Sequence, residues 1–241
     1  MIANHPSSIF AKLMKYWKKN TIYRLLNMHN FHREETTYHS VFITLQKISV
    51  MLENYNIILA SNSPRRRELL AGLALPFQVK TIPGLEESYP SDLKEGDIPL
   101  FLAKQKAHAY DSLMEEKTMV ITADTIVWHN GEVLGKPKGR TDAIHMLQAL
   151  SGDTHQVYTG VCVRTKEKEI AFVSRSDVKF APLTEEEITF YVDHYQPFDK
   201  AGSYGVQEWI GYIAVEHIDG SFYNIMGLPI QRLYTELKNA F

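Results

Sequence analysis

The chain has 241 residues, of which 44% are hydrophobic and 22% are charged, and its formal net charge at pH 7 is −2. This composition is typical of a folded globular protein and excludes a fibrous or wholly disordered chain. The charge gives no reason to expect a nucleic-acid partner, and no apolar run approaches the roughly 20 residues of a membrane helix. A single cysteine, Cys162, excludes an intramolecular disulfide and a cysteine-built metal site.

Residues 1–50 differ in charge from the rest of the chain. They carry seven Lys/Arg against two Asp/Glu, a balance of +5 that leaves −7 for residues 51–241. We interpret them as extra to the domain that follows, either foreign to the natural protein because the start codon is placed too early, or flexible. The alternative is a basic amphipathic or targeting arm, since apolar residues between Phe10 and Trp17 recur at helical spacing beside lysines.

The first predicted elements are a buried strand at 57–60 and a helix that runs to about Leu73. Ser63 suits the N-cap of this helix and Pro64 its first position, and three arginines follow at once. Cations at a helix N-terminus oppose the helix dipole, so the cluster favours an anion bound by backbone N–H groups and guanidinium groups. A phosphate site is the functional reading, and a helix start with solvated arginines is the alternative.

Strands and helices alternate through the rest of the chain. Asp124 directly follows a predicted strand, at the end where open α/β sheets bind ligands. Asn130-Gly131 predicts a hairpin turn, and Thr184 with Glu187 predicts a capping box. The expected strands are 77–82, 119–123, 125–128, 132–134, 155–165, 170–179 and 213–217, and the expected helices are 98–116, 141–150, 184–192 and 229–237. This order predicts the α/β class, with a mixed central sheet flanked by helices.

Four sequence blocks occur in a fixed order along the chain. They are Ser-Asn-Ser-Pro-Arg-Arg at 61–66, Ala-Asp-Thr at 123–125, Gly-Lys-Pro at 135–137 and Asp-Lys-Ala-Gly-Ser-Tyr-Gly-Val-Gln at 199–207. In this order they resemble the Maf family of nucleoside triphosphate pyrophosphatases, from about residue 57 to 237. The resemblance implies two lobes around a nucleotide-binding cleft, as in the inosine triphosphate pyrophosphatases, and a domain at 51–241.

Asp124 is the first candidate for a chemical role. A buried aspartate is costly unless it is paired or metal-bound, so packing does not explain this one; a cap on the following turn is the alternative. The resemblance implies that Asp124 is the proton acceptor, and that Lys106 and Lys136 are catalytic cations on the phosphate side. Spacing alone does not separate Lys106 from Lys104, which lies on another face of the same predicted helix.

The resemblance also implies a divalent metal ion, Mg²⁺ or Mn²⁺, held by Asp124 and Glu86. Glu87 stays an alternative to Glu86 because the loop length is ambiguous by one residue. Two further groups complete the implied site: the phosphate-binding residues Ser61, Ser63, Arg65 and Arg66, and the substrate-specificity residues Arg65, Thr125 and Gln207. An amide side chain such as that of Gln207 both donates to and accepts from a uracil-type edge.

The resemblance implies hydrolysis of dTTP and UTP to the nucleoside monophosphate and pyrophosphate, in the cytoplasm. The substrate could include modified pyrimidine nucleotides, and no nucleic-acid partner or membrane span is expected. An alternative is a nucleotide-sensing regulator of septum formation that acts by binding, and a weaker one is hydrolysis of other nucleotides. The oligomeric state stays open, with a homodimer as one option.

Overall fold

The computed structural model describes residues 52, 54–85 and 87–241. The expectations for residues 1–50 and for Glu86 therefore lie outside the described residues. The strands are β1 (Asn56–Leu59), β2 (Gln78–Val79), β3 (Thr118–His129), β4 (Glu132–Leu134), β5 (Thr154–Arg164), β6 (Glu169–Phe180) and β7 (Val215–Asp219). The helices are α4 (Pro64–Ala71), α5 (Asp97–His108), α6 (Arg140–Leu150), α7 (Glu185–Tyr195), α8 (Trp209–Ala214), α9 (Phe222–Ile225) and α10 (Ile230–Ala240), with short 3₁₀ turns η2 (Asp111–Leu113) and η3 (Ala201–Ser203).

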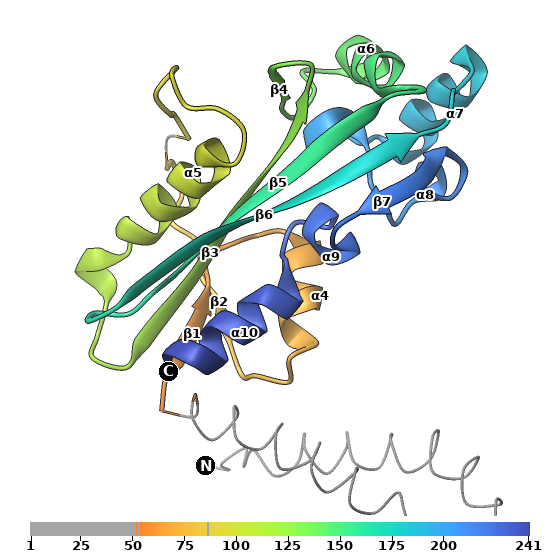
Figure 1. The fold of residues 1–241 in the computed structure, drawn as a ribbon. Coiled ribbons are helices and arrows are strands. Elements are labelled where there is room, and N and C mark those ends of the chain that lie inside the picture. Colours follow the sequence, from red (N-terminus) through yellow and green to blue (C-terminus); the bar gives the residue numbers. More distant parts are fainter. Residues whose placement is uncertain (1–51, 53, 86) are drawn as a thin grey trace, which may run out of the picture. The chain divides into compact units, whose positions relative to one another are not determined.

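The strands form one seven-stranded sheet in the order β2-β1-β3-β5-β6-β7, with β4 paired to β3. Strand β1 runs parallel to β2 and β3. Strand β3 pairs antiparallel with β4 and β5, and β6 pairs antiparallel with β5 and β7. The predicted mixed sheet with flanking helices is confirmed. Helices α4 and α10 lie near one end of the long strands and α6 to α8 near the other (Figure 1).

Helix α5 covers one face of the sheet, and α4, α9 and α10 lie on the other (Figure 1). The contact between α5 and the sheet is close because β5 has a glycine beneath it: a Cβ atom on Gly160 would lie 2.3 Å from the carbonyl carbon of Pro99 in α5. The Thr122 hydroxyl of β3 donates to the Ala103 carbonyl of α5 at 2.7 Å. Since side chains alternate along a strand, Asp124 lies on the α5 face and Thr125 on the opposite face.

The prediction that Asp124 follows the end of a strand is wrong, because β3 is continuous from Thr118 to His129. Instead, the strand pairing along one edge of β3 is interrupted. Strand β1 pairs only as far as Ile121, and β4 pairs only from Val127 onward. Residues 122–126 therefore border a gap in the sheet, directly beyond the carboxyl end of β1, and Asp124 lies at its centre.

Three other elements differ from the sequence-based prediction. Helix α5 ends at His108 instead of about residue 116, and the buried Tyr110 beyond it donates its hydroxyl to the Lys80 carbonyl at 2.6 Å. Strand β2 has only two residues, both exposed. The segment expected to open a strand at 213 belongs to α8, and the strand begins at Val215.

The predicted local signals are confirmed. Ser63 caps α4 by accepting from the Arg66 backbone N–H at 3.4 Å. Thr184 and Glu187 form the reciprocal capping box of α7. Asn130 and Gly131 both have positive φ, as a two-residue hairpin turn requires. Cys162 is fully buried in the core.

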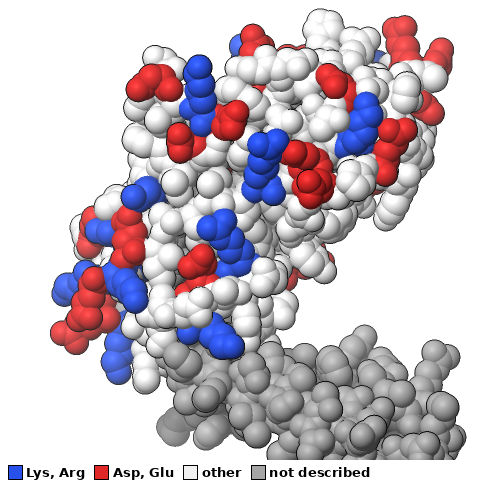
Figure 2. Space-filling model, in the orientation of Figure 1, with Lys and Arg blue, Asp and Glu red and all other residues white. Residues whose placement is uncertain are grey.

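The described surface carries charges of both signs. Lys and Arg side chains are interspersed with Asp and Glu on the face that Figure 2 shows. Within the described part of the chain, helices lack the combined length and apolar character needed to cross a bilayer.

Candidate active site

The loop from β1 into α4 brings two serines and two arginines to the gap. Ser61 is buried, and its hydroxyl accepts from the Ser63 backbone N–H at 3.3 Å and from Arg66 Nη1 at 3.4 Å. The first turn of α4 contains no acidic residue. Pro64 has no N–H and the Arg66 and Arg67 N–H groups donate to Ser63, so among the described residues the free backbone donor of this turn is that of Arg65. Together with two guanidinium groups it makes a cationic helix start, the environment that binds phosphate.

Arg66 is held against the face of β3 that carries Thr125. Its Nη2 donates to the Thr125 hydroxyl at 3.0 Å and its Nε to the Gly227 carbonyl at 2.8 Å. Burial lowers the pKa of Arg66 from its ordinary value, and the charge of Asp124 counteracts this effect. An arginine nevertheless stays protonated at neutral pH, so Arg66 brings a fixed positive charge to the gap.

Thr125, a predicted specificity residue, is engaged inside the protein. Besides accepting from Arg66, its hydroxyl lies 3.0 Å from that of Thr159 in β5. Thr159 in turn donates to the Asn224 carbonyl of α9 at 3.0 Å. Thr125 therefore connects Arg66 to α9.

Asp124 lies on the other face, beside α5. Lys106 Nζ lies 2.7 Å from Asp124 Oδ1 and 3.0 Å from Glu87 Oε1. Lys104 points elsewhere on α5 and pairs with Glu169 at 3.2 Å, so the two lysines lie on different faces, as predicted. The side chains of Lys106 and Asp124 are 15% and 12% exposed, which leaves their ion pair little screened by water.

The arginine group and the aspartate group thus approach the gap from opposite faces of β3. Arg66 and Thr125 lie on the α4 face, and Asp124 and Lys106 on the α5 face. Both groups lie beside the stretch of β3 that pairs with neither β1 nor β4. In a fully paired sheet the backbone of a neighbouring strand would separate them.

Lys136, the other predicted catalytic cation, is exposed in the loop between β4 and α6 and has no hydrogen bond or ion pair with another described residue. The preceding Gly135 carbonyl accepts from the Gly202 backbone N–H at 3.1 Å. This bond ties the Lys136 loop to the segment at 199–207. The structure therefore does not bring Lys136 into contact with Asp124.

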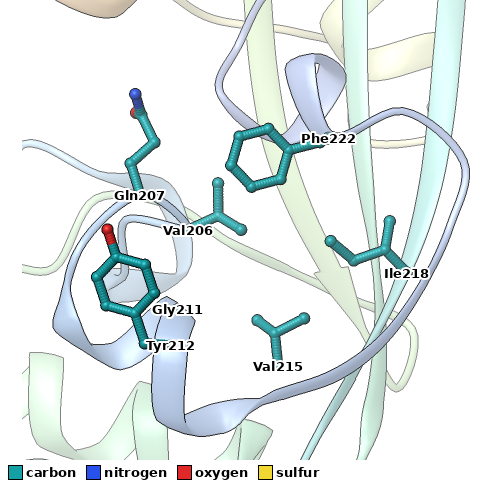
Figure 3. Close-up of a pocket in the computed structure, with 7 residues that line it drawn as sticks. All are labelled: Val206, Gln207, Gly211, Tyr212, Val215, Ile218 and Phe222. Carbon is teal, nitrogen blue, oxygen red and sulfur yellow. The ribbon is translucent and has the colours of Figure 1, made fainter.

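Gln207 lies at the rim of a pocket of about 450 Å³. Its amide and the Tyr212 hydroxyl are the polar side-chain groups of a lining that is otherwise apolar (Figure 3). A few polar groups on apolar walls are typical of small-molecule sites. The pocket is lined by Val206, Gln207, Gly211, Tyr212, Val215, Ile218 and Phe222.

Sequence reasoning missed an ion-pair network next to Arg65. Asp199 Oδ2 lies 3.4 Å from Arg65 Nη1, and Asp199 Oδ1 lies 2.8 Å from the buried Lys200 Nζ. Lys200 also pairs with Glu208 at 3.1 Å. The fourth sequence block opens with Asp199 and Lys200, and this pair of opposite charges was the available signal. Arg65 lies 134 residues before Asp199, and Glu208 lies across a turn from Lys200, so the sequence did not indicate these partners. No local sequence pattern indicated that the Gly227 carbonyl accepts a hydrogen bond from Arg66.

Comparison with known proteins gives a consistent picture. Residues 56–240 match the Maf family, described as Maf-like protein. A protein of Bacteroides fragilis (strain YCH46) named dTTP/UTP pyrophosphatase is 61% identical over 187 residues, covering 78% of this chain and 97% of that protein. A protein of the same name from Flavobacterium psychrophilum is 47% identical over 187 residues, covering 78% and 95%.

A HAM1 protein from Coxiella burnetii is a more distant structural match, with a TM-score of 0.43 and 16% identity over 77% of this chain and all of that one. The family match spans the described strands and helices together with the gap in the sheet. The chain belongs to the Maf family.

Proposed function

We propose that the chain hydrolyses dTTP and UTP to the nucleoside monophosphate and pyrophosphate. The observation that carries the proposal is the gap beside β3, which Asp124 and Lys106 border from one face and the cationic start of α4 from the other. The names of the relatives support the hydrolase hypothesis and not the septum-regulator hypothesis. Because nucleoside triphosphates are metabolites of the cytoplasm, we place the activity there.

In this proposal the triphosphate is held by the start of α4. The Arg65 backbone N–H and the side chains of Arg65 and Arg66 bind phosphate oxygens, and Ser61 and Ser63 keep the turn in shape. Lys106 and Lys136 supply positive charge for the leaving pyrophosphate, a task that suits a compact charge on a long side chain. Lys136 is exposed, so it is accessible to such a ligand.

Asp124 is the proposed proton acceptor for the water that attacks the α-phosphorus. Without nucleotide its charge is neutralised by Lys106 at 2.7 Å. A bound triphosphate competes for Lys106, and Asp124 then becomes free to accept the proton. Lys106, once paired with the triphosphate, stabilises the charge that develops on the leaving group in the transition state.

The donors beside Lys106 fit a hard divalent cation. The carboxylates of Glu87 and Asp124 lie 3.0 and 2.7 Å from one ammonium, so they converge on a single cationic position. Mg²⁺ is often held by one or two carboxylates together with substrate phosphates. We propose that Asp124 with Glu87, or with Glu86, holds Mg²⁺ or Mn²⁺, which when bound neutralises phosphate charge.

Base selection is assigned to the pocket at Gln207. A pyrimidine base is flat and largely apolar on its faces, which suits the Val206 and Phe222 walls, while the Gln207 amide matches the donors and acceptors of a uracil or thymine edge. Thr125 contributes indirectly by holding Arg66.

The activity is tested with a panel of canonical and modified nucleoside triphosphates in the presence of Mg²⁺ or Mn²⁺. Pyrophosphate and phosphate release are measured separately, because only cleavage between the α and β phosphates yields pyrophosphate directly. We expect kcat/KM for dTTP and UTP to exceed that for purine nucleotides by roughly tenfold or more. Phosphate release without pyrophosphate, or no preference for dTTP and UTP, would contradict the proposal.

Replacing Gln207 tests the base assignment. We expect Gln207→Ala to reduce the preference for dTTP and UTP by roughly 1–3 kcal/mol, because a hydrogen-bonded base edge loses its partner. Gln231→Ala, which removes an exposed amide on α10, serves as the control. An equal loss on all nucleotides in Gln207→Ala would instead assign this glutamine a structural role.

A further inference from the structure

Arg65 and Arg66 are consecutive cations that point to different partners. Arg66 contacts Thr125 and the Gly227 carbonyl, whereas Arg65 pairs with Asp199 at 3.4 Å. Their charges oppose one another: the charge of Arg65 contributes to lowering the pKa of Arg66. Because like charges repel, the separate acceptors stabilise two adjacent guanidinium groups and fix them in different positions.

Asp199 is itself held in place from behind. Lys200 Nζ lies 2.8 Å from Asp199 Oδ1 and 3.1 Å from Glu208 Oε1, and Lys200 is only 9% exposed. Glu208 also accepts from the Tyr191 hydroxyl, which in turn accepts from the Gly205 backbone N–H at 3.0 Å. The network therefore extends from α7 to the exposed carboxylate oxygen that meets Arg65.

The charges of this network favour an ionised Asp199. Burial raises the pKa of Asp199. The combined effect of Lys200 and Arg65 is larger and opposite, so the pKa lies below its ordinary value. Burial and Glu208 raise the pKa of Tyr191, so its hydroxyl stays protonated and donates. One face of the Asp199 carboxylate is thus occupied by a buried cation, and the other is available to Arg65.

We propose that Asp199 is a positioning residue for the Maf reaction, which holds Arg65 apart from Arg66 and aims it at the substrate phosphates. The inference rests on the proposed function, because it needs Arg65 to bind substrate. Asp199 does not touch the reacting atoms. It acts through Arg65, and the pair Lys200–Glu208 fixes its own position.

The test is a double-mutant cycle with Arg65→Ala and Asp199→Asn, measured on the best substrate of the nucleotide panel. We expect Asp199→Asn to raise KM by roughly two- to fivefold and to leave kcat within about twofold, since a partly exposed ion pair is weak and substrate binding is its role. In the Arg65→Ala background, Asp199→Asn should have no further effect. A merely structural role would not depend on Arg65.

Asp193→Asn is the matched control. It breaks another Arg–Asp pair, on the surface of α7, in which Arg140 Nε lies 2.6 Å from Asp193 Oδ1. This substitution should leave KM unchanged. An unchanged KM in Asp199→Asn, or an equal effect with and without Arg65, would overturn the positioning role while leaving the hydrolase proposal intact. Failure of the unaltered chain to hydrolyse any nucleotide of the panel would overturn both.

Discussion

At the scale of single residues, the contact between Asp124 and Lys106 accounts for a carboxylate inside a mostly apolar strand. An unpaired buried charge would be costly, and an ammonium 2.7 Å away offsets part of that cost. The pair has a functional consequence as well. In the proposed reaction, a bound phosphate competes with Asp124 for the lysine.

Asp124→Asn is expected to lower kcat by about 10³-fold or more, because the amide can neither accept a proton nor neutralise a cation. The measurement is dTTP hydrolysis, with circular dichroism to show that the variant is folded. Asp177→Asn, which alters an Asp–Arg pair on the neighbouring strand β6, should keep normal turnover. Near-normal activity in folded Asp124→Asn would remove this residue from the mechanism.

His155 predicts a pH dependence of stability. It is fully buried, its Nε2 lies 2.7 Å from the Tyr204 hydroxyl, and its Nδ1 has no partner among the described residues. Burial lowers its pKa from 6.5 to about 3, so the folded state keeps it neutral while the unfolded state takes up a proton below pH 6.5. The stabilisation is complete above pH 6.5 and is lost as the pH falls toward 3.

Between pH 7.5 and 5, His155 should account for a decrease of roughly 2 kcal/mol in the free energy of unfolding. Urea unfolding gives the free energy of unfolding of the unaltered chain and of His155→Gln at both pH values. The contribution of His155 is the difference between the two chains in how much this free energy changes with pH. Equal changes in the two chains would show that His155 does not titrate on unfolding.

At the scale of elements, Gly160 sets how closely α5 approaches the sheet. The glycine lies opposite Asp124 in the β3–β5 register, and α5 carries Lys106. The distance between helix and sheet therefore also sets the distance between Lys106 and Asp124. A side chain at this position would have to push the backbone of α5 outward.

Gly160→Ala should lower the free energy of unfolding by roughly 1–3 kcal/mol, because its Cβ would lie 2.3 Å from the Pro99 carbonyl carbon. It should also lower kcat/KM, since the shift of α5 moves Lys106. Denaturant unfolding and dTTP hydrolysis measure the two effects. Gly139→Ala, whose Cβ would meet nothing within 4 Å, is the control; similar stability of both variants would contradict the argument.

At the scale of the whole molecule, we propose that residues 51–241 carry the full activity. The family match covers 56–240, and the Bacteroides fragilis relative aligns with 78% of this chain over 97% of its own length. The break from +5 to −7 in net charge falls at the same place.

A chain that begins at Met51 should therefore hydrolyse dTTP within about twofold of the full chain and unfold at a similar denaturant concentration, since contributions outside a cooperative core are small. Both measurements are made side by side on the two chains. An insoluble or inactive short chain would show that residues 1–50 are integral. Full activity combined with loss of membrane association would favour the basic arm.

The sequence by itself determined the class of fold, the N-caps of two helices and the family. Hydrophobic periodicity and capping residues are local signals, which is why the N-caps at Ser63 and Thr184 and the turn at Asn130-Gly131 were predictable. The four ordered blocks identified the family because each is short but their order is specific. Periodicity could not show where β3 ends, because a strand that continues past a polar residue keeps the same alternation.

Only the tertiary structure decided how the candidate site is assembled. The gap between β1 and β4 depends on which strands pair and for how long, and hydrogen-bonded registers are formed by residues far apart in the chain. For the same reason the structure alone separates Lys106 from Lys104, places Arg66 and Asp124 on opposite faces, and brings Asp199 to Arg65. The ion pairs of Asp124 with Lys106 and of Asp199 with Arg65 join residues far apart in the sequence, so they form only when the chain folds.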